Sequence, residues 1–128
     1  MVCLDSDLLI AFMKGDSDAG KAVLASKDKG PIKTTVINEY ELLKGASSSK
    51  GEENLAVVKG LLSAIEVLPL DDDSCEVAAR LYNEMRAEGK TTGEFDLLIA
   101  AVALRNNESL VTRDGHFKRI RGLELIGW

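Results

Sequence analysis

Aromatic residues are scarce in this chain of 128 residues: Phe, Trp and Tyr together make up 5% of it. The core must therefore be built mainly from Leu, Ile, Val and Ala. Hydrophobic residues make up 45% of the chain, which is enough for one folded domain over residues 1–128. The longest apolar run, 97–104, is far shorter than the roughly 20 residues of a membrane-spanning helix, so we expect no membrane span.

Cysteine is nearly absent as well. Cys3 and Cys75 fit no metal-binding spacing and lie in segments of apolar pattern, which favours two buried, reduced thiols. A Cys3–Cys75 disulfide stays open as an alternative, because some hyperthermophiles form disulfides in the cytosol. The chain also lacks an opening basic stretch followed by a long apolar run, so we expect no signal peptide and a cytoplasmic protein.

Positive charge is in short supply, because 16 Lys and Arg face 21 Asp and Glu and the net charge is −5. This balance argues against a protein that simply coats nucleic acid. Four carboxylates holding two divalent cations would change the net charge to about −1 and would place the cations where a phosphate docks. An acidic, metal-dependent nuclease is therefore compatible with the composition, and we expect it to have negligible affinity for nucleic acid without metal.

Strand and helix patterns alternate along the chain. We predict strands over 2–6, 32–35, 66–70, 109–112 and 123–126, and helices over 8–14, 17–28, 37–44, 53–63, 73–87 and 94–105. Strands separated by helices favour parallel pairing, so the expected fold is a three-layer α/β/α domain with a mainly parallel central sheet.

Two segments carry more detailed expectations. Segment 45–53 is rich in Gly and Ser and is predicted to be a mobile loop after a helix that stops at Gly45. Helix 73–87 is amphipathic, and helical spacing places the following residues on its buried side: Cys75, Ala78, Ala79, Tyr82 and Met85.

Two acids follow predicted strands at the end where parallel sheets bind ligands. Asp5 follows the first strand; the alternative is that it caps the next helix, but Asp7 fits that role better by position. Asp114 follows the strand 109–112, where an aspartate before Gly115 is also a common turn residue. Thr112 adds a hydroxyl that could hydrogen-bond a ligating carboxylate.

Asp96 carries the clearest physical signal. The residues that follow it, 97–104, are all apolar and predict a helix buried on most sides. A charged carboxylate there is costly unless it is paired, neutralised or bound to a metal. Thr91 and Glu94 could cap this helix as a capping box, so Asp96 is not needed as a cap and a functional role is favoured.

Glu39 and Glu41 compete for a fourth position. At 100° per residue their side chains point to nearly opposite sides of a helix, so at most one faces the same site. Periodicity alone does not choose between them.

Taken together, these segments resemble PIN-domain nucleases. The segment 4–10 (Leu-Asp-Ser-Asp-Leu-Leu-Ile) resembles the family's opening, and 41–45 matches its Glu-Leu-x-x-Gly element, which selects Glu41 over Glu39. The segment 96–104 matches an Asp heading Leu-Leu-Ile-Ala-Ala-x-Ala-Leu, and 110–114 matches Leu-Val-Thr-x-Asp, followed by Phe117. The four elements stand in family order over essentially the entire chain, and in length and style it is similar to VapC-type toxins of prokaryotic toxin–antitoxin pairs.

The resemblance implies a PIN-like α/β fold, an endoribonuclease that cleaves RNA, a cognate antitoxin that blocks the acidic site with a basic side chain, and a homodimer. It further implies that Mg²⁺ or Mn²⁺ is bound by four acids: Asp5, Glu41, Asp96 and Asp114. Hard carboxylate oxygens suit these ions better than zinc. Our hypothesis gives Asp5 and Asp96 the inner-sphere role and the other two an outer or second-metal role. The chain departs from the family in having Ser6 where Thr is frequent and Asp7 where Asn is frequent.

Basic residues and the single histidine cluster just after Asp114. A lone histidine in a turn favours a surface or capping role for His116. The basic residues are either solvated or in contact with the RNA backbone at the rim of the site, and the sequence does not choose. They are Arg113, Lys118, Arg119 and Arg121.

Parts of the sequence are also compatible with other classes of protein. Asp5-Ser6-Asp7 after an apolar strand also resembles the nucleophile motif of haloacid-dehalogenase-type phosphatases, but the hydroxyl expected two positions beyond the second Asp is missing. A receiver domain would need a phosphoacceptor Asp ending a central strand and a Lys ending a later one, and neither is found. A third alternative is a binding module whose main role is to engage a partner protein.

Overall fold

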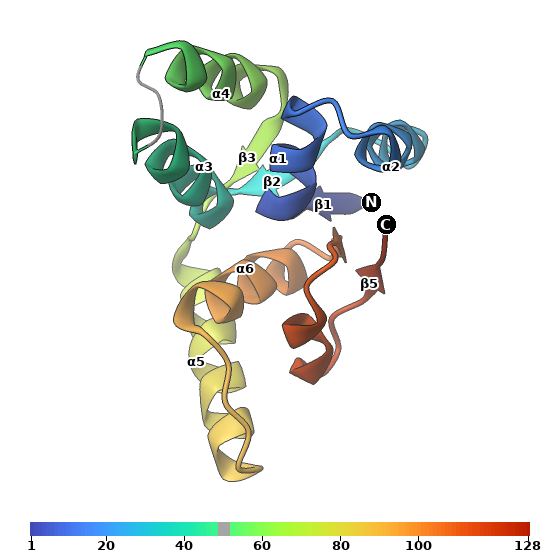
Figure 1. The fold of residues 1–128 in the computed structure, drawn as a ribbon. Coiled ribbons are helices and arrows are strands. Elements are labelled where there is room, and N and C mark those ends of the chain that lie inside the picture. Colours follow the sequence, from blue (N-terminus) through green and yellow to red (C-terminus); the bar gives the residue numbers. More distant parts are fainter. Residues whose placement is uncertain (49–51) are drawn as a thin grey trace.

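A five-stranded sheet forms the centre of the computed structural model, which describes residues 1–48 and 52–128 (Figure 1). Its strand order is β3-β2-β1-β4-β5, and all neighbouring strands pair in parallel. The strands are β1 (Val2–Leu4), β2 (Lys33–Thr35), β3 (Glu66–Leu68), β4 (Ser109–Val111) and β5 (Leu125–Ile126). The prediction of a mainly parallel central sheet is confirmed.

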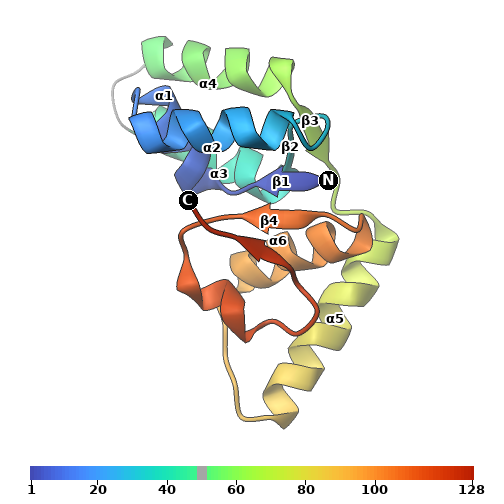
Figure 2. The ribbon, with the colours of Figure 1, turned by 90° about the vertical axis from the view of Figure 1, so that its right-hand side faces the viewer.

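Helices cover both faces of this sheet (Figures 1 and 2). One layer contains α1 (Ser6–Met13), α2 (Ser17–Lys27), α3 (Val36–Ser48) and α4 (Glu52–Ala64). The other contains α5 (Asp72–Ala87) and α6 (Glu94–Arg105), with a short 3₁₀ helix, η1 (Gly115–Arg119), beside them. Among the described residues, no helix combines the length and apolar character needed to cross a membrane.

Each central strand serves two hydrophobic cores. On β1, Val2 and Leu4 pack into the core shared with α1 to α4, whereas Cys3 belongs to the core on the α5 and α6 side. On β4 the same alternation places Val111 in the first core and Leu110 in the second. Because successive side chains of a strand point to opposite faces, burial on both faces explains why all three residues of β1 and the last two of β4 are apolar.

The strand order brings two distant segments together at one edge of the sheet. From β1 the chain moves outward to β2 and β3, and then returns to place β4 on the other side of β1. Ligands of such open sheets bind at this reversal, beyond the carboxyl ends of the strands. Asp5 directly follows β1, and residues 112–114 directly follow β4.

Several element boundaries differ from the prediction, among them the start of α1 and the end of α3. Helix α1 begins at Ser6, because the Asp5 side chain accepts a hydrogen bond from the Ser6 amide (2.9 Å) and caps the helix. The expected cap by Asp7 is therefore wrong. Helix α3 continues through Gly45 to Ser48, so the prediction of a helix that stops at Gly45 is also wrong. Residues 49–51 of the expected loop lie outside the described residues.

The buried side of α5 also differs from the prediction. Its buried residues are Ser74, Ala78, Leu81 and Met85, so the stripe is rotated by about one residue from the expected one. Leu81 is 2% exposed, whereas Tyr82 is 46% exposed. Both cysteines are free, but Cys75 is exposed and only Cys3 is buried. The structure contains no Cys3–Cys75 disulfide, and the expected burial of Cys75 is wrong.

The neighbours Leu81 and Tyr82 provide a test of this register. Truncating Leu81 leaves a cavity between α5 and α6, so Leu81→Ala should lower the free energy of unfolding by about 2–4 kcal/mol. Tyr82→Ala removes more atoms but from an exposed position, and should change it by less than about 1 kcal/mol. Urea denaturation of the two variants measures both values. A larger loss for Tyr82→Ala than for Leu81→Ala would contradict the observed packing of α5.

Candidate active site

Asp5 lies in the crevice between β1 and β4 and is only 6% exposed. Its backbone amide donates to the Val111 carbonyl (3.1 Å), which continues the pairing of β1 with β4. Its Oδ1 accepts from the amide of Ser6 (2.9 Å) and from Asn38 Nδ2 (2.9 Å), and its Oδ2 accepts from Thr112 Oγ1 (2.6 Å). Three segments therefore fix the orientation of one carboxylate.

Asn38 is the residue that the sequence reasoning missed. It is 0% exposed and lies in the first turn of α3. Thr35 Oγ1 accepts from the Asn38 amide (3.1 Å) and Asn38 Oδ1 accepts from the Thr35 amide (3.4 Å), which is the reciprocal pattern of a capping box with Asn as the third helical residue. Thr35 Oγ1 also donates to Asn38 Oδ1 (2.7 Å). The Thr-x-x-Asn spacing at a helix start was the signal that could have revealed it.

Asn38 also connects Asp5 to Glu41. Its amide Nδ2 donates to Ser6 Oγ (2.8 Å), and Ser6 Oγ in turn donates to Glu41 Oε1 (2.8 Å). The structure therefore brings Glu41 into the network around Asp5, as the order of the motifs indicated. Ser6 and Asn38 hold the two acids without neutralising either of them.

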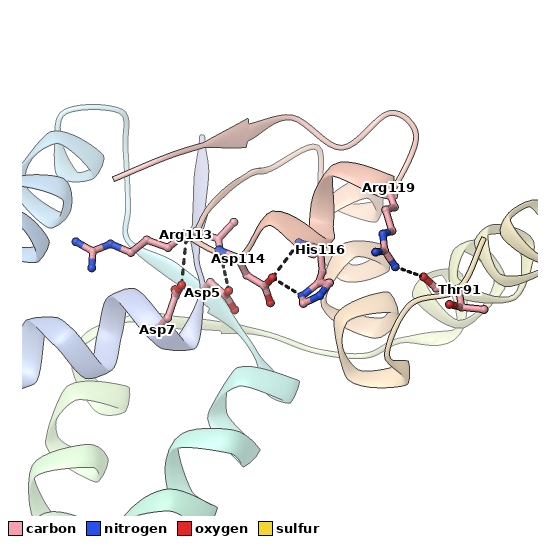
Figure 3. A network of polar contacts seen from close by, with 8 residues as sticks. Asp5, Asp7, Thr91, Arg113, Asp114, His116 and Arg119 are labelled. Carbon is pink, nitrogen blue, oxygen red and sulfur yellow. Dashed lines mark hydrogen bonds and ion pairs between the residues drawn. The ribbon is translucent and has the colours of Figure 1, made fainter.

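A second group of side chains forms around Asp114. One ligand atom each of Asp96, Asp114 and His116 lies within 4.8 Å of the others, which makes this a group able to hold a metal ion. Asp114 caps η1, and its Oδ1 accepts from the His116 amide (2.9 Å) and contacts His116 Nδ1 (2.7 Å). Figure 3 shows the Asp114 carboxylate pointing toward the imidazole ring. The exposed His116 is a surface residue, as expected, but it also belongs to this group, which the sequence did not indicate.

The grouping of the acids differs from our hypothesis. We expected Asp5 and Asp96 to share the inner position, whereas Asp114 is the carboxylate that accompanies Asp96. Thr112 connects the two halves of the site, because its Oγ1 donates to Asp5 Oδ2 and accepts from the Asp114 amide (3.0 Å). The hydroxyl anticipated from the sequence thus binds one acid and positions the backbone of another.

Asp96 lies in the first turn of α6, where it is partly buried. The helix begins after Gly93, and no side chain caps it. The expected capping box is wrong, because the N-cap residue is Gly93 and Thr91 lies two residues before it. The Thr91 carbonyl accepts from Arg119 (2.9 Å). Burial raises the pKa of Asp96, and the negative charges of Asp114 and Glu41 raise it further. These three carboxylates therefore share one electrostatic environment.

Burial has a stronger effect on Asp5, whose pKa rises from 3.8 to about 6. The hydrogen bond from Thr112 opposes this rise, and the charge of Asp7 adds to it. Asp7 itself faces away, because its Oδ1 accepts from the Leu8 amide (2.7 Å) and its Oδ2 from the Arg113 amide (3.1 Å), which Figure 3 shows. Asp7 thus ties α1 to the loop after β4 while acting on Asp5 through its charge.

The oxygens that remain available fit a divalent cation. Within the described part of the chain, no donor bonds to either oxygen of Asp96, to Oδ2 of Asp114 or to Oε2 of Glu41. Negative oxygens that lack donors repel one another, which is the arrangement that Mg²⁺ or Mn²⁺ stabilises. The donor set is therefore suitable for a hard cation.

The comparisons with known proteins agree with this geometry. The family model described as "PIN domain" matches residues 2–123, so the chain belongs to the PIN-domain family. It is 29% identical to a "tRNA(fMet)-specific endonuclease VapC" of Shigella flexneri, covering 98% of this chain and 96% of the relative. It is 31% identical to a "Ribonuclease VapC1" of Rickettsia felis, covering 96% and 92%.

Solved structures give the same result. The fold is similar to that of a chain in a VapBC2 complex of Rickettsia felis bound to a DNA fragment from its promoter, with a TM-score of 0.91, 28% identity and coverage of 100% and 99%. It is also similar to a chain of DNA-bound VapBC from Salmonella typhimurium, with a TM-score of 0.89 and 28% identity over 100% and 99%.

The raised pKa of Asp5 has a consequence for stability. Between about pH 4 and about pH 6 the folded protein keeps a proton that the unfolded chain has lost, so this group lowers stability as the pH rises through that range, by about 3 kcal/mol in total. The Asp5→Asn variant does not lose this stability as the pH rises, because its amide does not titrate. In EDTA, the free energy of unfolding of the variant relative to the parent should increase by up to about 3 kcal/mol from pH 4 to pH 7. Parallel pH profiles from urea denaturation would contradict the burial effect.

The buried position of Asn38 gives a second test. Asn38→Ala removes the acceptor of the buried Thr35 hydroxyl and one of the two donors to Asp5 Oδ1, so it should lower the free energy of unfolding by about 2 kcal/mol. Asn83 is an exposed residue of α5 and provides the matched control, for which Asn→Ala should cost less than about 0.5 kcal/mol. Thermal unfolding compares the two variants. Equal effects would show that the network around Asn38 contributes nothing to stability.

Proposed function

We propose that this chain is a metal-dependent endoribonuclease that hydrolyses RNA phosphodiester bonds, and that it is the toxin of a toxin–antitoxin pair. The observation that carries the proposal is the convergence of four acids from distant segments on the edge where β1 and β4 end: Asp5, Glu41, Asp96 and Asp114. The printed names of the relatives, ribonuclease and tRNA(fMet)-specific endonuclease, support RNA as the substrate. The VapBC complexes among the solved structures support an antitoxin as the partner.

The four acids would hold Mg²⁺ or Mn²⁺. Asp96 and Asp114 supply the most accessible oxygens, and the nitrogen of His116 in the same group favours Mn²⁺, which accepts nitrogen ligands more readily than Mg²⁺. When bound, such an ion lowers the pKa of a water molecule and stabilises negative charge on the leaving oxygen.

The residues of the chain contribute orientation and charge. Asn38 and Thr112 hold Asp5 in a single orientation, and Ser6 holds Glu41, so these two acids need little rearrangement when the site is used. Burial raises the pKa of Asp5 and of Asp96, and the charges of Asp114 and Glu41 raise that of Asp96 further, so the charged forms of these two acids are costly without a counter-charge. The site therefore has a built-in requirement for cations, which fits the acidic composition of the chain.

The phosphatase alternative is less consistent with the geometry. It would require the second acid of Asp5-Ser6-Asp7 to face the first as an acid and base. Both oxygens of Asp7 instead accept from backbone amides, those of Leu8 and Arg113. A cytoplasmic location, a homodimer and a single domain over residues 1–128 are parts of the proposal that rest on composition and on the resemblance to the family.

An RNA cleavage assay tests this function directly. The purified chain should cleave single-stranded or structured RNA with Mg²⁺ or Mn²⁺ and should lose this activity in EDTA. Asp96→Asn and Glu41→Gln should each reduce the cleavage rate by at least about a hundredfold, because each removes a charge from the cation site.

Glu39→Gln is the matched control, because it makes the same change two positions from Glu41 but on the opposite side of α3. Its rate should stay within about twofold of the parent. Cleavage that survives EDTA and the Asp96→Asn change would overturn the proposal. A protein that binds a partner but cleaves no RNA under any metal condition would favour the binding-module alternative.

A further inference from the structure

A cavity of about 500 Å³ opens beside the candidate active site, between the loop after β4, η1 and the final strand. Thr112 and Asp114 of the acidic site lie in its wall. Two cationic side chains and one indole ring also line it: Arg113, Lys118 and Trp128. The acidic site, which must accept a polyanion, therefore shares the loop after β4 with a cavity lined by positive charge.

Arg113 is held in a defined orientation at this cavity. Its guanidinium lies over the Trp128 ring, 3.5 Å from the ring centroid, and its Nε donates to the Trp128 carbonyl (3.2 Å). Its backbone amide donates to Asp7 Oδ2 (3.1 Å). Trp128 in turn packs against the core beneath α1 to α4. The planar guanidinium is thus supported on one face by an anchored ring, while the side chain as a whole is exposed.

The four basic residues after β4 divide into two pairs. Arg119 donates to the Thr91 carbonyl (2.9 Å), and Arg121 donates to Glu88 Oε1 (2.6 Å), so both stabilise the fold. In the described parts of the chain, no acceptor bonds to the Nη atoms of Arg113 or to Nζ of Lys118. These two cations can therefore bind a ligand without breaking an existing contact.

Arg113 also leaves the acids uncompensated. Figure 3 shows its side chain extending away from Asp114, and the indole ring holds it there. A cation that served to neutralise the acidic group would point toward it. The positive charge of Arg113 instead lies beside the acidic site, where an RNA strand bound across the acids would continue.

We propose that this cavity binds the nucleotide next to the cleaved phosphodiester of a single-stranded RNA, with a base stacked on the guanidinium of Arg113 and a phosphate paired with Lys118. Arginine planes are common stacking surfaces for unpaired bases, and lysine binds phosphate as a point charge. This inference rests on the proposed function, because it needs the acids to be the cleavage site. It makes Arg113, Lys118 and Trp128 determinants of RNA binding.

The observations favour RNA over an acidic polypeptide. A carboxylate ligand would use the edge of the guanidinium, whereas the ring of Trp128 fixes the plane and leaves a flat face for another flat group. The shared wall with Asp114 also places the cavity directly beside the acidic site rather than at a separate surface.

The test measures binding apart from cleavage, in the inactive Asp96→Asn background with Mg²⁺. Fluorescence anisotropy with a short fluorescein-labelled single-stranded oligoribonucleotide gives Kd at several salt concentrations. Arg113→Ala should weaken binding about tenfold through lost stacking, and Arg113→Lys should weaken it too without changing the salt dependence. Lys118→Ala should reduce the slope of log Kd against log salt by about 0.7, the value for one phosphate contact on a single strand.

Arg80→Ala is the matched control, because Arg80 is an exposed cation of α5. It should leave both Kd and salt dependence unchanged.

In the active background, Lys118→Ala and Arg113→Ala should raise KM about tenfold and keep kcat within about threefold, as expected for lost binding rather than lost chemistry. Unfolding curves that match the parent confirm that both variants are folded. Lys118→Ala keeps the test valid if Arg113→Ala is unstable, because Nζ of Lys118 bonds to no acceptor among the described residues.

Three results would overturn the inference. The first is RNA binding by the variants equal to that of the parent, while the parent still cleaves RNA. This result would exclude a role of the cavity in RNA binding and would leave the proposed function standing. The second is a loss of binding to labelled poly-L-glutamate, used as an acidic-polypeptide probe, as large as the loss of RNA binding. The third is a parent that neither binds nor cleaves RNA, which overturns the proposed function as well.

Discussion

The hydrogen bond from Thr112 Oγ1 to Asp5 Oδ2 (2.6 Å) connects the carboxyl ends of β1 and β4, where the candidate active site lies. Asp5 follows β1 and Thr112 follows β4, and these strands are neighbours although more than 100 residues separate them in the chain. The bond is short, it is buried, and its acceptor is a carboxylate, which is the strongest kind of neutral-donor contact in a protein. The rest of the site extends from this contact, through Asn38 to Glu41 on one side and through the backbone of Asp114 to Asp96 on the other.

The hydrogen bonds around Asp5 keep this carboxylate oriented, but its burial lowers the stability of the folded chain. Donors from Asn38, Ser6 and Thr112 lower the pKa of Asp5, but burial outweighs them and the pKa still reaches about 6. The folded chain thus keeps Asp5 where its charged form is costly. The pKa of Asp96 is raised by its burial and, further, by the charges of Asp114 and Glu41. Such a cost persists because the sheet and both cores hold these residues in place independently of the site.

The same loop separates two kinds of charge. Its aspartate, Asp114, faces His116 and the acidic group, whereas its arginine, Arg113, is turned over Trp128. One short loop therefore displays an anion and a cation to different regions. A chain with net charge −5 can in this way present cations where a polyanion would bind, without neutralising its own acids.

The sequence by itself determined the class of fold and the parallel sheet, because apolar periodicity is a property of short segments, and the order of its motifs was enough to propose the four acids. It did not determine which buried residues hold those acids: Asn38 looks like an ordinary helix residue until Thr35, Ser6 and Asp5 surround it. Nor did it fix the buried stripe of α5, the continuation of α3 through Gly45, or the placement of Asp114 and His116 beside Asp96. These depend on contacts between residues that are far apart in the chain, and only the packing of the strands and helices against one another decided them.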